Sequence, residues 1–182
     1  FAPPAAAVRD GVFKGINSVS AGLPPAGAIL YALDGSLPTQ SSPLDTGPVT
    51  LTETGVLRAV SFEEGALPSR PLTLSFFINE GHTLPVVSET ANDPAAFRDM
   101  YDYGTKGLEL PGSIAWYDGG SSFSLGCGIK MHGDPSLVLP KKNMSVRFRG
   151  SYGSEQLDYD LFGGGVTAFT NLLLRAGQDQ SN

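Results

Sequence analysis

The chain has 182 residues, of which 41% are hydrophobic and 16% are charged, and its formal net charge is −6. This length suits one large domain or two small ones. With 12 basic residues against 18 acidic ones, the composition carries no electrostatic footprint for nucleic acid or for an anionic membrane. No apolar run approaches the ~20 residues of a membrane-spanning helix, so we expect no membrane insertion.

The composition indicates short strands joined by turns, without a disulfide or metal framework. The 23 glycines and 14 prolines are typical of strands joined by many turns. The lone Cys127 cannot form a disulfide within the chain, and its place between two glycines predicts a small buried side chain. His82 and His132 are far apart in the sequence and no metal-ligand spacing is visible, so we expect no metal site.

Residues 1–79 have the pattern of an all-β region. Short apolar or alternating runs predict strands at residues 28–33, 49–52, 56–62 and 72–78. The first of these runs ends at Asp34-Gly35, a strong turn signal. Because turn signals recur at intervals of roughly ten residues, we expect a β-sandwich of about seven strands.

The first half contains a motif of a known family. Residues 30–39, LYALDGSLPT, resemble the YTLDGSxPT signature of the chitobiase/β-hexosaminidase C-terminal domain, with Ala32 and Leu37 departing from it. The predicted strands at residues 57–62 and 69–77 fit the same module. The resemblance implies an immunoglobulin-like accessory β-sandwich of secreted bacterial proteins over residues 1–79, without catalysis.

A polar link at residues 80–83 separates this region from residues 84–182. Within the second region we predict a strand at 84–88, a short helix at 95–100 opened by Asn92-Asp93-Pro94, a strand at 113–117, a turn at Asp118-Gly119-Gly120, and a buried strand at 169–176 whose apolar partners lie beyond Asn182.

Residues 126–148 predict a β-hairpin with a long loop. Residues 128–132 and 143–148 alternate as strands do, and Gly133-Asp134-Pro135 interrupts the pattern. Lys141 and Lys142 stand where the second strand begins. Because successive strand side chains point to opposite faces, one lysine points into any cleft beside the sheet. Such a lysine suits a phosphate contact, and two solvated charges at a strand edge are the other interpretation.

Residues 84–182 resemble the N-terminal part of the spore-coat protein H (CotH) kinase-like family. The motifs occur in the family's order and spacing: LPVVS at 84–88, GIKMHG at 128–133, Ser136, PKK at 140–142, Arg147-Phe148, Tyr152-Gly153, YDLF at 159–162 and LRAGQD at 174–179. Asn143-Met144 and Leu137 depart from the family pattern.

This second resemblance implies the incomplete, β-rich start of an α+β kinase-like domain, so the whole chain is expected to be mainly β. The family's lysine after proline contacts the nucleotide phosphates, which assigns Lys141, with Lys130 or Arg147 as a weaker second cation. The resemblance implies an extracellular or cell-surface bacterial parent protein, an atypical kinase that uses ATP with Mg²⁺ or Mn²⁺. The family's metal-binding and catalytic acidic residues lie further on, so we expect no catalytic residue, cofactor or phosphotransfer in these 182 residues.

The alternative function is a non-enzymatic adhesion or carbohydrate-surface module, with a protein or a cell-surface polymer as its partner. The aromatic residues Tyr101, Tyr103, Trp116 and Tyr117 could form a stacking platform for sugars, and could equally lie in the core. Asp158 and Asp160 either share a strand face and bind a cation, or belong to a solvated turn.

Overall fold

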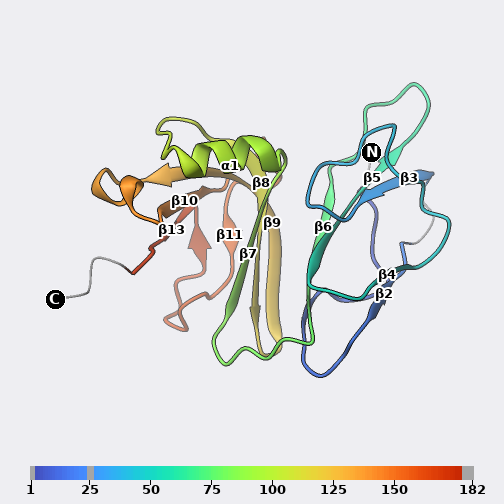
Figure 1. Cartoon of the computed structure of the whole chain (residues 1–182), viewed down its shortest axis with the longest axis horizontal. Helices are drawn as coiled ribbons and strands as arrows, with labels where there is room; N and C mark the ends of the chain where they lie inside the picture. Colours follow the sequence, from blue (N-terminus) through green and yellow to red (C-terminus); the bar gives the residue numbers. More distant parts are fainter. Residues whose placement is uncertain (1–2, 24–26, 178–182) are drawn as a thin grey trace. The chain divides into compact units, whose positions relative to one another are not determined.

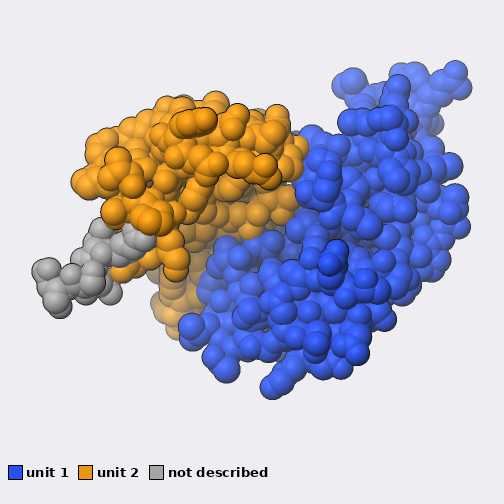
Figure 2. Space-filling view, in the orientation of Figure 1, with its two compact units in different colours: residues 1–88, 115–124 blue, residues 89–114, 125–182 orange. Residues whose placement is uncertain are grey.

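The fold is mainly β, and the computed structural model of the chain describes residues 3–23 and 27–177. Within these residues there are thirteen strands, one α-helix and one 3₁₀-helix (Figure 1). Contacts divide the chain into two compact units (Figure 2). Unit 1 comprises residues 1–88 and 115–124, and unit 2 comprises residues 89–114 and 125–182. No helix in the described part is both long and apolar enough to span a membrane.

Unit 1 contains a four-stranded sheet in the order β1-β6-β5-β3. Its strands are β1 (Gly11–Phe13), β3 (Ala28–Ala32), β5 (Gly55–Phe62) and β6 (Leu72–Ile78). Strand β5 is antiparallel to both β3 and β6, whereas β1 joins β6 in parallel. Parallel partners need a long connection between them. Here the connection from β1 to β6 contains β2 to β5.

A two-stranded sheet of β2 (Val19–Ala21) and β4 (Val49–Leu51) completes a sandwich. In both strands the outer residues are buried and the middle one is exposed, as strand alternation requires. Apolar side chains of the two sheets meet in one cluster, formed by Val19, Ala21, Leu23, Ile29, Val49, Leu51, Leu57, Ala59, Leu74, Phe76 and Ile78. The described part of residues 1–79 thus has six strands, where the sequence predicted about seven.

The predicted turn after β3 is present and is held by two side chains. Gly35 has a φ of 80°, which glycine adopts without strain. The Asp34 carboxylate accepts hydrogen bonds from the Ser36 hydroxyl (2.6 Å) and backbone N–H (3.0 Å), which lower the pKa of Asp34. The fully buried Arg58 donates to the Gly35 carbonyl oxygen at 3.2 Å, and burial lowers the pKa of its guanidinium to about 10. These bonds account for the Asp-Gly-Ser motif as a structural turn.

A second large sheet has five strands in the order β13-β10-β9-β8-β7. The strands are β7 (Val86–Ala91), β8 (Leu110–Asp118), β9 (Ser121–His132), β10 (Asn143–Arg147) and β13 (Asn171–Leu174). Strands β7, β8 and β9 each contribute residues to both units. The tip of the β8–β9 hairpin, residues 115–124, belongs to unit 1.

The helix predicted after β7 is confirmed as α1 (Pro94–Asp102). Asp93 caps it by accepting a hydrogen bond from the Ala96 N–H at 2.9 Å. Pro94 occupies the first turn, where its missing N–H costs nothing. The helix extends two residues past its predicted end, to Asp102, and Tyr103 is its C-cap. The apolar Met100 anchors its last turn in the core.

The predicted hairpin at residues 126–148 is confirmed as β9 and β10, joined through the 3₁₀-helix η1 (Pro135–Val138). Ser145 lies opposite Lys130, and Val146 lies opposite Ile129. One face of the hairpin is therefore apolar, with Val146 and Ile129 fully buried. The other face carries Lys130, Ser145 and Arg147.

The strand predicted at residues 169–176 is divided in two. Phe169 belongs to β12 (Ala168–Phe169), which pairs with β11 (Leu157–Asp158), and β13 starts after Thr170. Leu172 is buried while Leu173 is 44% exposed. The two leucines differ because they lie on opposite faces of a strand at the edge of its sheet. Gln178 and Asp179 of the LRAGQD motif lie outside the described residues.

The predicted link at residues 80–83 lies inside unit 1, which continues to Ser88. The hydroxyls of Ser75 and Ser88 are hydrogen-bonded at 2.8 Å, which ties the start of β7 to β6. The rings of Phe77 and Tyr117 meet edge-on, with centroids 5.9 Å apart. These contacts group the hairpin tip with the first unit. The predicted domain boundary at residues 80–83 stays a prediction.

Candidate functional site

The predicted nucleotide-binding residues occupy one hairpin of unit 2. Lys130 on β9 lies opposite Ser145, and Arg147 on β10 lies opposite Gly128. Because directly opposed residues share a face, Lys130 and Arg147 project on the same side of the sheet, two residue pairs apart. Lys141 precedes β10 in a bend and is exposed. The structure thus places two of the three cations on one sheet face, and the third in the loop that leads to it.

Arg147 is part of an ionic cluster centred on Glu109, whose side chain is only 17% exposed. Its Nε lies 3.8 Å from Glu109 Oε2, and the Nε of Arg149 lies 3.2 Å from Oε1. The Tyr152 hydroxyl donates a hydrogen bond to Oε1 at 2.9 Å. Burial, followed by this hydrogen bond, raises the pKa of the Tyr152 phenol. A protein carboxylate therefore already balances part of the positive charge on this face.

The close approach of Tyr152 to β9 depends on two glycines. A Cβ on Gly126 would lie 1.9 Å from the Tyr152 carbonyl oxygen. A Cβ on Gly128 would lie 2.6 Å from both Glu109 Oε1 and the Tyr152 ring. Glu109 was missed by the sequence analysis, since it lies forty residues before Arg149 and no spacing signal connects the two. The glycine pair next to Cys127 was the signal that could have indicated a close contact.

Lys142 and Lys106 help to hold the loop between β9 and β10. The Lys142 ammonium donates to the Leu139 carbonyl oxygen at 2.9 Å and lies 5.2 Å from the centre of the Tyr101 ring. The Tyr101 hydroxyl donates to the Pro140 carbonyl oxygen and accepts from the Lys142 N–H, each at 3.2 Å. Lys106 forms an ion pair with Asp134. Lys142 is therefore engaged in the loop, and Lys141 is exposed at the loop surface.

The acidic pair Asp158 and Asp160 is used by local turns. Asp158 accepts a hydrogen bond from the Gln156 side-chain amide at 2.6 Å, and Asp160 accepts one from the Gly165 N–H at 3.3 Å. Only Asp158 lies in a strand. Across residues 3–23 and 27–177, no group of three or more His, Cys, Asp or Glu side chains is arranged to hold a metal ion.

The four aromatic residues proposed as a sugar platform do not behave as a set. Tyr117 is buried at 7% exposure, whereas Tyr103 is 82% exposed. Tyr101 and Trp116 are intermediate. Tyr101 and Tyr103 belong to unit 2, and Trp116 and Tyr117 belong to unit 1. Because Tyr117 is buried, a stacking surface that includes all four rings is not supported.

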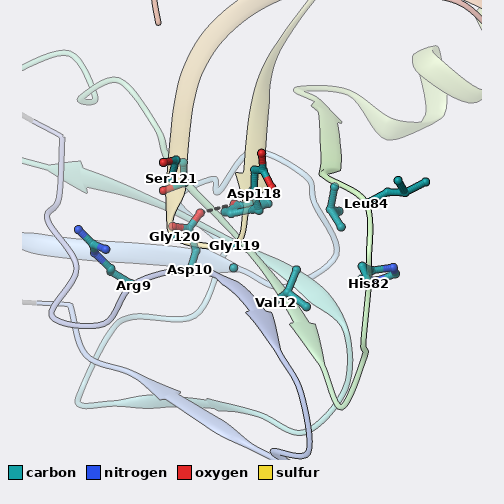
Figure 3. Close-up of a pocket in the computed structure, with 13 residues that line it drawn as sticks. Arg9, Asp10, Val12, His82, Leu84, Asp118, Gly119, Gly120 and Ser121 are labelled. Carbon is teal, nitrogen blue, oxygen red and sulfur yellow. Dashed lines mark hydrogen bonds between the residues drawn. The ribbon is translucent and has the colours of Figure 1, made fainter. Parts of the chain in front are cut away.

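Unit 1 contains a cleft of about 320 Å³ beside the β8–β9 hairpin tip (Figure 3). Its lining combines charged, hydroxyl and apolar groups: Arg9, Asp10, Gly11, Val12, His82, Leu84, Val86, Tyr117, Asp118, Gly119, Gly120, Ser121 and Ser122. Asp10 accepts a hydrogen bond from the Tyr117 hydroxyl, and burial and this bond raise the pKa of Tyr117. The glycine turn follows from local sequence, but the cleft does not, since residues 9–12, 82–86 and 118–122 meet only in the folded unit.

The first unit contains a small β-sandwich, formed by the four-stranded and the two-stranded sheets. Residues 8–73 match the family model of the chitobiase/β-hexosaminidase C-terminal domain, so the chain contains this domain over about a third of its length. The predicted LYALDGSLPT signature lies inside the match. No curated protein and no solved structure matches the chain. None of these comparisons supports the resemblance of residues 84–182 to the CotH family.

Proposed function

We propose that the chain is part of a secreted or cell-surface bacterial CotH-like protein in which residues 84–182 take part in nucleotide recognition. In this proposal the β-sandwich is a non-catalytic accessory module. The residues assigned to the nucleotide phosphates are Lys141 and, more weakly, Lys130 and Arg147. The ordered series of motifs in residues 84–182 is the basis for naming this class of parent protein.

The observation that carries the proposal is the grouping of these cations on the β9–β10 hairpin. Lys130 and Arg147 share a face, and the exposed Lys141 follows Pro140 in the loop that enters β10. Pro140 restricts the backbone at the start of this segment, so the lysine has a limited range of directions. An ammonium group is a compact charge suited to phosphate oxygens. Arg147 is the weaker candidate, because its guanidinium already has Glu109 as an ionic partner.

The expected chemistry of the 182 residues alone is weak binding without phosphoryl transfer. ATP carries several negative charges, and one or two lysines without a bound metal leave most of them uncompensated. Phosphoryl transfer also needs metal ligands and a residue that orients the acceptor hydroxyl. We assign these roles to residues of the parent protein that follow Asn182.

The test is calorimetry with ATP and Mn²⁺ on the 182-residue chain and on a form extended through the next residues of its gene. We expect the extended form to bind more tightly, and Lys141→Ala to weaken its binding about tenfold or more, as loss of a charge-assisted contact does. Lys14→Ala, which removes a lysine of unit 1 at residue 14, is the charge-matched control and should bind as the unsubstituted protein does.

Two results would contradict the proposal. If Lys141→Ala leaves the affinity of the extended form unchanged, Lys141 has no role in phosphate binding. If the 182-residue chain transfers phosphate by itself, the assignment of the catalytic groups to later residues is wrong.

A second candidate function is non-enzymatic binding to a cell-surface polymer. The observation that favours it is the cleft of unit 1, which combines carboxylate, guanidinium and hydroxyl groups with apolar side chains. This candidate needs no nucleotide and involves residues distant in the sequence from Lys141. It is tested by polymer pull-down with insoluble polysaccharides: retention of the chain on none of them would contradict it.

A further inference from the structure

The cleft of unit 1 is formed by three segments of the chain. Residues 9–12 lead into and form part of β1, residues 82–86 connect β6 to β7, and residues 118–122 form the hairpin tip. Its volume of about 320 Å³ is within the range of small-molecule sites, which starts near ~300 Å³. A cleft of this size can hold a short ligand but not a folded partner.

Asp10 is the best-positioned polar group in the cleft. Its Oδ2 accepts hydrogen bonds from the Tyr117 hydroxyl and from the Ser75 N–H, the latter at 3.4 Å. Both bonds reach Oδ2, and an ionised carboxylate can accept about four hydrogen bonds, so Asp10 keeps capacity to accept from a ligand. Tyr117 is buried, so it fixes the carboxylate in one orientation. The carboxylate is therefore a pre-oriented acceptor for a ligand hydroxyl.

The rest of the lining mixes polar and apolar side chains. In Figure 3, Arg9, Asp10 and Ser121 lie toward one side of the view, and Leu84 and His82 lie toward the other. Leu84 is 78% exposed, so it presents apolar surface at the cleft. His82 is already bonded to Glu80 at 2.7 Å.

This combination points to a ligand that has hydroxyl groups and an apolar ring face. Asp10 and Asp118 supply acceptors, Arg9 and the serine hydroxyls supply donors, and Val12 and Leu84 supply apolar surface. By formal charge, Arg9 balances one of the two lining carboxylates, Asp10 and Asp118, so the lining carries a net charge of only about −1. We propose that the cleft binds a short neutral saccharide. The inference rests on the second candidate function for its ligand class, and is independent of the nucleotide proposal.

The test is a ¹H–¹⁵N NMR titration of the whole 182-residue chain with cellobiose, maltose and chitobiose. The expected result is that at least one sugar shifts the amide signals of Gly11, Gly119, Gly120 and Ser121. Asp118→Ala, at the exposed hairpin tip, should weaken binding about tenfold, as should Asp10→Asn. Asp102→Ala, at the exposed end of α1, is the matched control and should leave the affinity unchanged. If Asp10→Asn does not fold because Tyr117 and Ser75 need the carboxylate, Asp118→Ala decides the question.

Three results would overturn the inference. One is the absence of shifts in the cleft with every sugar up to its solubility limit. Another is a response of the cleft to Ca²⁺ alone, which would make it a cation site. The third is sugar binding whose shifts fall elsewhere, for example at Tyr103; this would leave polymer binding in place as a function and remove it from the cleft.

Discussion

Glu89 is a single residue whose surroundings oppose its charge. Its Oε1 is shielded from solvent and has no hydrogen-bond partner among the described residues. Burial raises the pKa of this carboxyl from 4.5 to about 7. The nearby Cys127 is fully buried, and desolvation followed by the charge of Glu89 raises the pKa of its thiol. Cys127 is thus the inert small side chain that its position between glycines predicted.

Glu89→Gln should stabilise the protein in alkaline solution. The folded state holds a proton on Glu89 that the unfolded state releases above pH 4.5, so the free energy of unfolding falls as the pH rises from 4.5 to about 7. Glutamine does not ionise, so the variant keeps its free energy of unfolding over this pH range. We expect a gain of about 1–3 kcal/mol near pH 8 and little change near pH 4, measured by urea unfolding.

The exposed Glu155 provides the control for this pH dependence. Glu155→Gln should change the free energy of unfolding by less than ~0.5 kcal/mol at either pH, as surface substitutions usually do. An equal effect of Glu89→Gln at both pH values would show that packing, and not the proton, is responsible.

At the scale of elements, the segment after β10 packs closely against β9 at two glycines of that strand. Tyr152 approaches Gly126 and Gly128 too closely for any side chain at these positions. The contact brings the Tyr152 hydroxyl to Glu109, which in turn holds Arg147 and Arg149. The glycines are therefore part of the arrangement of the basic face, although they carry no charge.

Gly126→Ala should destabilise unit 2 by about 1–3 kcal/mol, the usual cost of overpacking. The new Cβ would lie 1.9 Å from the Tyr152 carbonyl oxygen, and backbone cannot move aside as a side-chain tip can. Chemical denaturation measures the loss. Gly164→Ala is the matched control, since its Cβ would meet nothing within 4 Å. Equal stabilities of the two variants would show that the Tyr152 segment does not rest on β9.

Local patterns predicted many of the elements but missed β1 and β2, and they could not predict long-range contacts. Alternation and Gly or Pro interruptions located β3, β5, β6 and the β9–β10 hairpin, and the Asp-Pro pair located α1. The pairing of Glu109 with Arg149 spans forty residues and leaves no local trace. The same limit applies to the cleft, which Asp10 and Tyr117 form from positions 107 residues apart. Candidate cations could be listed from the sequence, but their partners could not.

At the scale of the whole molecule, sequence and contacts divide the chain differently. The motif pattern puts the boundary at residues 80–83, whereas contacts group residues 115–124 with the first unit. The sandwich core nevertheless lies entirely between Val19 and Ile78. What the hairpin tip adds to this core is peripheral: the Tyr117 ring against Phe77, and the Tyr117 hydroxyl on Asp10.

A protein of residues 1–83 should therefore fold without the rest of the chain. We expect dispersed amide signals in NMR and cooperative thermal unfolding, because every member of the core cluster is present. Loss of the Tyr117 ring uncovers Phe77, so binding of a hydrophobic dye should exceed that of the full chain. Collapsed amide dispersion would contradict this prediction and would make the hairpin tip an essential part of the sandwich.

The parallel pairing of β1 with β6 has a mechanical consequence. Gly11, Val12 and Phe13 lie opposite Phe76, Phe77 and Ile78, with both strands running the same way. Pulling on the chain before Gly11 and after Ile78 draws these strands past each other along their length. The load then falls on all the hydrogen bonds between them at once, and not on one bond after another as when a hairpin is peeled open. The β1–β6 pair should therefore resist a pulling force applied to the two chain segments that flank the sandwich.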